Sequence, residues 1–126
     1  MREEARERAR RLAEAARDRN AEDVVALEVG ALTSFADAFV LATAGSDRQA
    51  RAVADAVTEA MQQAGTQPLG VEGYEEGRWI LIDGGDVIVH VFVRDAREHY
   101  DLDRLWGDAP KIALPEPAVA AQGIRR

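Results

Sequence analysis

The chain has 126 residues, enough for one domain with a single core and too few for two domains of ordinary size. It contains no cysteine, which excludes disulfides and thiolate metal sites, and no apolar run approaches the roughly 20 residues that a membrane-spanning helix needs. The formal net charge is -7, although residues 1–19 carry seven arginines against five acidic residues. Phosphate backbones repel so acidic a body, so we expect no direct nucleic-acid binding.

The charge and the N-terminal sequence also bear on compartment and partners. Residues 1–20 are charged throughout and lack the apolar segment of a secretory signal, so the expected location is the cytoplasm. Excess negative charge favours encounter with a basic protein surface, but it also keeps a protein soluble without any partner. Composition alone leaves both interpretations open.

The first half of the sequence alternates helical and strand patterns. Leu12 and several alanines recur at helical spacing, which predicts a helix with a weakly packing stripe. Further on, Ser46 and Gln49 have the spacing of a capping box, and Gly65 is typical of a helix end. The predicted elements of this half are a helix over 2–19, strands over 23–30 and 36–46, and a helix over 46–65.

The second half changes to strand periodicity and then back to a helical pattern. A proline-bounded run over 67–74 predicts a short strand near a sheet edge. Two strongly apolar runs, 78–83 and 86–93, predict central strands joined by a two-residue turn at Gly84-Gly85. Residues 94–110 read as a broken helical stretch in which Asp101 can cap the second part.

This order of elements predicts the α/β fold class, with a mixed sheet of about five strands packed by helices. The helix after the second strand is the natural place for a parallel crossover. We expect one domain over 1–112, followed by a disordered tail over 113–126, because that tail is proline-rich and has little to pack.

One strand–helix turn is typical of an enzyme family. Gly45-Ser46 is similar to the phosphate-holding turn of nucleotidyltransferases, and a helix N-terminus attracts anions. That chemistry also needs two carboxylates on one face of a neighbouring strand to hold divalent metals. The candidate strand, 87–90, supplies none, so we interpret Ser46 as a helix cap.

The histidines and the clustered acids are weak signals of chemistry. His90 and His99 lie nine residues apart and lack the spacing of a metal site, and a lone strand histidine is more often structural. The carboxylates of residues 95–103 alternate with arginines at helical spacing, which is typical of an ion-paired surface. We expect no enzyme, no cofactor and no metal.

Three runs taken together resemble the ribosomal silencing factor family, also known as RsfS, Iojap-like or DUF143 proteins. They are the loop "ALTSFAD" (31–37), "DAFVLATAGSDRQARAVAD" (37–55) and "EGYEEGRWILIDGGDVIVHVFVRDAREHYDLDRLWGDAP" (72–110). The resemblance spans roughly residues 3–112. Ala38 stands where the family usually has an aromatic residue, and Gly84 where it often has a larger one.

The resemblance implies a nucleotidyltransferase-like fold without its metal-binding acids, and a function without a reaction. Family members bind the large-subunit ribosomal protein numbered fourteen, a basic protein at the face where the subunits meet. They thereby repress translation by sterically blocking joining of the ribosomal subunits, and they are commonly homodimers when free. Two alternatives stay open: a diverged nucleotidyltransferase-like enzyme, and a homodimeric scaffold for another cytosolic partner.

Aromatic residues near the end of the chain are the candidate contacts. A turn at Gly84-Gly85 would place Trp79 opposite His90, on the same sheet face as Phe92. Leu102 and Leu105 have the spacing of core residues, whereas Trp106 is open between core and interface. The predicted partner-binding residues are Trp79, His90, Phe92, Tyr100, Asp101, Leu102, Asp103 and Trp106.

Overall fold

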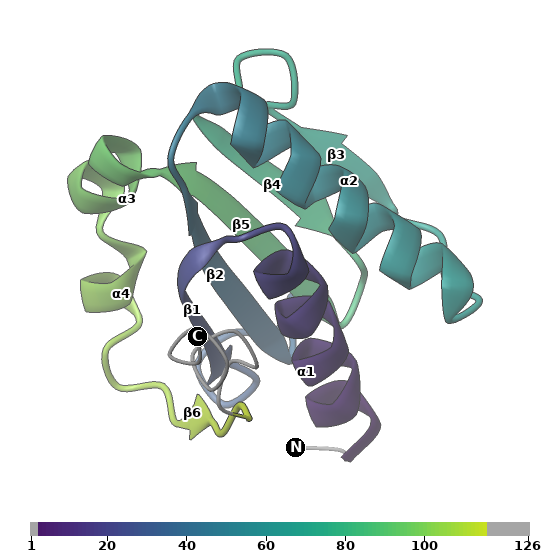
Figure 1. Ribbon diagram of the computed structural model, residues 1–126. Helices are drawn as coiled ribbons and strands as arrows, with labels where there is room; N and C mark the ends of the chain where they lie inside the picture. The colour runs from purple at the N-terminus through teal and green to yellow at the C-terminus, as the bar shows by residue number, and fades with distance from the viewer. Residues whose placement is uncertain (1–2, 116–126) are drawn as a thin grey trace, which may run out of the picture.

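A six-stranded mixed sheet forms the centre of the protein, and the computed structural model describes residues 3–115. Its strand order is β3-β4-β5-β2-β1-β6. Figure 1 shows α1 and α2 lying across one face of this sheet, with α3 and α4 at its other side. The elements are α1 (Glu3–Asp18), β1 (Glu22–Glu28), β2 (Ala38–Ala44), α2 (Asp47–Gln63), β3 (Gly70–Glu72), β4 (Trp79–Asp83), β5 (Val87–Val93), α3 (Arg94–Tyr100), α4 (Leu102–Leu105) and β6 (Lys111–Ile112).

The predicted α/β class and mixed sheet are confirmed, including the parallel pairing. β2 pairs with β5 in parallel, and the remaining strand pairs are antiparallel. The prediction of about five strands missed β6, which pairs with β1 and buries Ile112. A two-residue strand leaves no period in the sequence, so only its pairing reveals it.

The chain continues along α1 after β6. Arg10 Nε donates a hydrogen bond to the carbonyl oxygen of Ala113 (3.2 Å), and Arg17 Nη1 donates to that of Pro115 (2.6 Å). The remaining part of the predicted tail, 116–126, lies outside the described residues. The domain boundary at residue 112 therefore stays a prediction.

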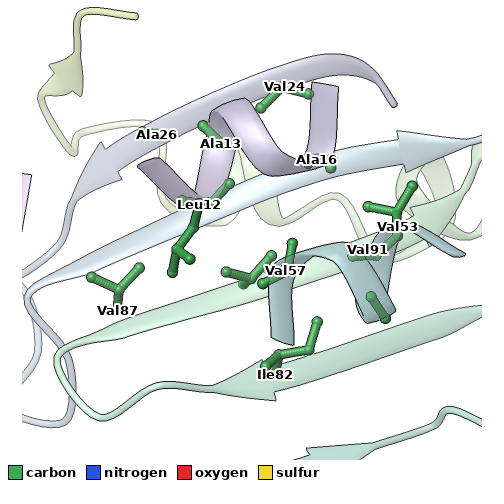
Figure 2. Close-up of a cluster of buried hydrophobic side chains, with 14 of the residues drawn as sticks. Leu12, Ala13, Ala16, Val24, Ala26, Val53, Val57, Ile82, Val87 and Val91 are labelled. Atoms are coloured by element: carbon green, nitrogen blue, oxygen red, sulfur yellow. The ribbon is translucent and has the colours of Figure 1, made fainter. Parts of the chain in front are cut away.

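The main core lies between the sheet and the helix pair α1 and α2. Figure 2 shows Leu12 from α1 and Val57 from α2 pointing onto the strands, in the same buried cluster as Ile82 and Val91. The alanine-rich stripe of α1 is buried throughout, as its periodicity predicts. The apolar stripe of α2 is likewise buried, and Ala64 beyond it is exposed because the helix ends there, before Gly65 at φ +85°.

The predicted cap of α2 is present, with one difference in its partner. Ser46 Oγ accepts a hydrogen bond from the Gln49 backbone N–H (3.1 Å), as in a capping box. Gln49 Oε1 accepts in return from the N–H of Gly45 (2.7 Å), one residue before the cap. Gln49 Nε2 also donates to the carbonyl oxygens of Arg19 and Asn20, so this side chain links the start of α2 to the end of α1.

The predicted register of the β4–β5 hairpin is wrong by one turn residue. The N–H of Gly84 donates to the carbonyl oxygen of Val87 (2.9 Å), so the two turn residues are Gly85 and Asp86. The turn settles there because Gly85 adopts φ +91°, a left-handed conformation that glycine tolerates best. Trp79 therefore lies opposite Phe92, and the residue opposite His90 is Leu81. Moving the turn by one residue shifts the register by two, so every side chain keeps its predicted face.

Candidate partner-binding surface

The sheet face away from α1 and α2 is lined with aromatic rings. Phe39 contacts Trp106 edge to face, with ring centroids 5.1 Å apart. Trp79 packs against Phe92 (5.1 Å) and against Tyr100 (4.5 Å). We name this surface the aromatic face; its members are Phe35, Phe39, Trp79, His90, Phe92, Tyr100 and Trp106.

Exposure divides the aromatic face into a buried floor and an accessible top. Phe39, His90 and Phe92 are buried, so they form the floor. Trp79 and Trp106 are half-buried above it, and Tyr100 is 49% exposed. The face thus presents parts of two tryptophans and one tyrosine to solvent above a buried base.

A hydrogen bond joins the top of the aromatic face to its floor. Trp79 Nε1–H donates to His90 Nδ1 over 3.1 Å, so the neutral imidazole carries its proton on Nε2. His90 Nε2 is buried and has no hydrogen-bond partner among residues 3–115. Burial lowers the pKa of His90 to about 4, since desolvation disfavours the charged ring. At neutral pH the ring is therefore an uncharged acceptor that orients Trp79.

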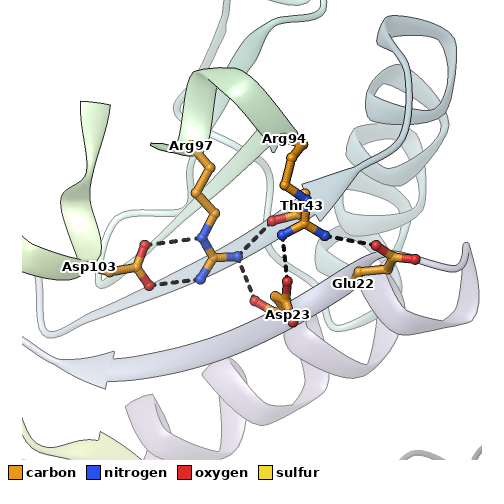
Figure 3. Close-up of polar contacts among 6 residues, drawn as sticks. All are labelled: Glu22, Asp23, Thr43, Arg94, Arg97 and Asp103. Atoms are coloured by element: carbon orange, nitrogen blue, oxygen red, sulfur yellow. Dashed lines mark hydrogen bonds and ion pairs between the residues drawn. The ribbon is translucent and has the colours of Figure 1, made fainter. Parts of the chain in front are cut away.

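Arg97 fastens the helices α3 and α4 to the sheet. Its guanidinium makes two parallel hydrogen bonds to the carboxylate of Asp103, with Nε–Oδ1 3.0 Å and Nη2–Oδ2 2.8 Å. Nη1 donates to Thr43 Oγ1 (2.8 Å) and to the carbonyl oxygen of Asp23. Figure 3 shows this side chain reaching from α3 to partners on both β1 and β2. Arg97 is almost fully buried, so these bonds decide where α4 lies.

The carboxylate of Asp103 is the acidic partner that holds the Arg97 guanidinium. The hydrogen bond from Arg97 lowers the pKa of Asp103, and both carboxylate oxygens are engaged by the guanidinium. The neighbouring Arg94 lies outside the buried network and pairs with Glu22 and Asp23 at the surface. Arg94 is thus ion-paired at the surface, but its partners lie on β1 and not among the acids of residues 95–103. The pair within that cluster is Arg97 with Asp103, and Arg97 is buried.

Asp101 separates α3 from α4 by its backbone. It adopts the left-handed conformation with φ +51°, and its N–H donates to the carbonyl oxygen of Arg97. Asp101 stands at the N-cap position of α4, as predicted, but its side chain makes no capping hydrogen bond. The break comes instead from the left-handed residue, a conformation that aspartate tolerates better than most side chains.

Leu102 and Leu105 differ in burial, although both have the spacing of core residues. Leu102 is buried on the sheet, as expected for a core residue. Leu105 is 70% exposed, so its predicted place in the core is wrong. Trp106 and Ala109 already fill the space over β2 beside Phe39, which leaves Leu105 outside.

The loop between β1 and β2 also belongs to this surface, although its residues were not among the predicted contacts. Phe35 is 60% exposed, and its ring centroid lies 6.2 Å from that of Phe39, so it extends the aromatic face. Leu32 in the same loop is also exposed. Two large apolar residues in a turn-rich segment without strand or helix period were the available signal.

Other kinds of site find little support in the part of the chain that the structure describes. Residues 3–115 bring together no three His, Asp or Glu side chains in a geometry suited to a metal ion. Across the same residues, no helix combines the length and the apolar character that crossing a membrane requires.

Comparison with known proteins places the whole chain in one group. The family described as "Ribosomal silencing factor during starvation" matches residues 2–125. The chain is 44% identical over 97 residues to "Ribosomal silencing factor RsfS" of Halalkalibacterium halodurans, covering 77% of this chain and 83% of that protein. It is 33% identical over 107 residues to "Protein Iojap, chloroplastic" of Zea mays, covering 82% of this chain and 45% of the maize protein.

Solved structures agree with the sequence relatives. A crystal structure of a Chromobacterium violaceum protein superposes with a TM-score of 0.80 at 36% identity, covering 94% of both chains. A Bacillus halodurans structure gives a TM-score of 0.72 at 40% identity, covering 82% of this chain and 94% of that one. At these identities the shared fold and the shared ancestry support each other.

Proposed function

Because the chain belongs to the ribosomal silencing factor family, we propose that it represses translation by binding the large ribosomal subunit through the protein numbered fourteen. Bound there, at the face where the subunits meet, it stands in the way of the small subunit. The family's role is regulatory, and on this proposal the protein acts by binding alone, in the cytoplasm.

The observation that carries the proposal is the exposure of large apolar side chains around the two half-buried tryptophans. Tyr100, Leu105 and Phe35 are each about half exposed or more. Contiguous apolar surface of this kind marks interaction sites in soluble proteins, and tryptophan and tyrosine are enriched among binding hot spots. Their rings bury large areas on contact while losing little conformational freedom.

The buried predicted residues act from beneath in this proposal. His90, Phe92 and Leu102 have almost no exposed area to offer a partner. They hold the rings above them at a fixed height and orientation, which lowers the ordering cost of binding. The direct contacts are then Trp79, Tyr100 and Trp106. Phe35 and Leu105 are added candidates at the rim. Phe35 extends the ring surface, and Leu105 is the more exposed of the two.

Charge complements this apolar centre. The chain is acidic overall, and a basic ribosomal protein would be steered towards it. Asp103 is held by Arg97, so its carboxylate fixes α4 before any partner arrives. The structure records no ion pair or hydrogen bond of the Asp101 side chain within residues 3–115, so Asp101 is the better placed of the two to meet a partner cation.

We also propose that the free protein is a homodimer, because an exposed apolar surface on a lone chain favours self-association. Whether the aromatic face itself lies in that dimer decides if subunit binding and dimerisation compete.

A binding experiment tests the proposal. Calorimetric titration of the purified large-subunit protein numbered fourteen into this protein should give a saturable heat, lost in a Tyr100→Ala variant that melts like the parent. Heat that is absent with the parent protein, or equal for both proteins, would contradict the assignment. Titration with nucleotides and magnesium should give no heat, and a saturable signal there would favour the nucleotidyltransferase-like alternative.

A further inference from the structure

A second surface lies on the opposite side of the sheet, in a groove between α2 and the edge strand β3. The groove has a volume of about 570 Å³, and its walls are Asp55 and Glu59 of α2, Val71 of β3 and the ring of Tyr74. Val71 pairs with Ile82, whose side chain belongs to the core under the helices, so the groove opens on the helix-covered side. The aromatic face lies on the other side of the same sheet, because Trp79 and Phe92 alternate with Ile80 and Val91 of the core under the helices.

The groove combines negative charge with exposed apolar side chains. Residues 52–77, which form most of α2, β3 and the following loop, contain five acidic residues and no basic one. Tyr74 Oη–H donates to the carboxylate of Asp55 (3.0 Å), which keeps that carboxylate at the groove wall. Val71 in the groove wall is 41% exposed, and Leu69, two residues earlier in the chain, is 75% exposed. A ligand that fits must therefore carry positive charge together with apolar groups.

The backbone of β3 adds a third element of recognition. β3 is the last strand on its side of the sheet and pairs only with β4 within residues 3–115, which leaves its outer edge without a strand neighbour. An exposed edge is a template for a further strand, because its free N–H and C=O groups can pair with an extended chain. The shape of the site thus favours an extended segment over a helix.

The spacing of the carboxylates agrees with such a segment. Asp55 and Glu59 are four residues apart on α2, a rise of about 6 Å along the helix axis. Alternate residues of an extended chain point to the same side and lie about 7 Å apart. Two basic side chains at alternate positions can therefore meet both carboxylates while the residues between them face away from α2.

We propose that this groove binds an extended protein segment that carries lysine or arginine at alternate positions. The site is separate from the aromatic face, so both surfaces can be occupied at once. The proposal does not depend on the proposed function, because it stands on the groove, its charge and the open edge of β3.

Titration of the full chain, followed by amide chemical shifts, tests the proposal. The probe is a capped nine-residue peptide with lysine at alternate positions and valine or threonine between, and its partner control replaces each lysine by glutamate. Shift changes are expected at residues 54–62 and 69–76 with the lysine peptide only. Glu59→Lys should weaken binding about fivefold or more. Glu98→Lys, an equal charge change at an exposed residue of α3, should leave the affinity within about twofold.

Three results would overturn the proposal. One is an equal loss of affinity in Glu59→Lys and Glu98→Lys, which would mean that only the net charge of the protein matters. Another is equal binding of the glutamate peptide. The third is evidence for another occupant. Amide shifts in the groove that depend on protein concentration without peptide would assign the groove to a second copy. Larger shift changes with a peptide of residues 116–126 than with the lysine peptide would assign it to that segment of the chain.

Discussion

The indole N–H of Trp79 donates to Nδ1 of His90, so a half-exposed ring is oriented by a buried neutral one. The two residues come from neighbouring strands, and Trp79 reaches His90 diagonally across the β4–β5 ladder. The other ring nitrogen of His90 is left without a partner among residues 3–115. A buried unsatisfied donor costs about 1–3 kcal/mol, so this arrangement favours a fixed ring position over maximum stability.

Replacing His90 should separate those two effects. His90→Phe removes the acceptor for Trp79 and the unsatisfied donor together, so the free energy of unfolding at pH 7 should change by no more than about 1 kcal/mol. The affinity for the ribosomal partner should fall because Trp79 loses its orientation. Thermal melting and calorimetric titration measure the two quantities, with Glu98→Gln on exposed α3 as the control. Unchanged affinity in His90→Phe would contradict the orienting role.

Stability should depend on pH through His90. The pKa of His90 is about 4 when folded and near 6.5 when unfolded, so only the unfolded chain takes up a proton between these values. The free energy of unfolding is therefore unaffected by His90 above pH 6.5. It falls by about 3 kcal/mol on this account as the pH drops towards 4. Urea unfolding at a series of pH values measures this slope. Between pH 6.5 and 4, His90→Phe should lose about 3 kcal/mol less of its unfolding free energy than the parent. An identical pH dependence in both proteins would refute the prediction.

Removing the Arg97 guanidinium should loosen α3 and α4. Arg97→Met leaves the carbonyl of Asp23 and the carboxylate of Asp103 without their donor. Because Asp103 is partly open to solvent, the expected cost is that of lost buried hydrogen bonds, about 1–3 kcal/mol. Arg104→Met, at an exposed position of α4, should stay within about 0.5 kcal/mol. Urea unfolding of both variants provides the comparison. Equal stability of the two would show that the buried network does not hold the helices.

Tyr100 and Trp79 should differ in what their truncation costs. Tyr100→Ala removes a side chain that is half exposed and should lower affinity about 30-fold or more while the melting temperature falls by only a few degrees. Trp79→Ala also removes packing on Phe92, so both affinity and melting temperature should fall. Melting curves and titrations on the same samples measure both. A Tyr100→Ala protein that binds like the parent would remove Tyr100 from the interface.

The order and type of the elements could be predicted from the sequence because each long element has its own period. The alanine stripe of α1, the capping residues of α2 and the apolar runs of β4 and β5 are local signals. The hairpin register needed one more fact, namely which glycine adopts the left-handed conformation, and the choice between Gly84 and Gly85 is settled by the fold. Strand β6 depends wholly on pairing with β1, so it carries no local signal.

The aromatic face was predictable in its residues but not in its depth. Trp79, His90 and Phe92 share a face by alternation alone. Which of them is buried depends on where α3 and α4 lie, and Arg97 decides that through partners 54 and 74 residues away in sequence. The exposure of Leu105 and Phe35 likewise depends on where other segments of the chain lie, which their local sequence does not reveal.

The most direct test of the central claim is a subunit-joining assay. Purified large subunits are incubated with excess protein before small subunits are added, and the fraction of joined ribosomes is measured by sedimentation. The account predicts that joining falls in proportion to occupancy, that the protein sediments with large subunits, and that Tyr100→Ala restores joining. Undiminished joining with the protein bound to large subunits would contradict it.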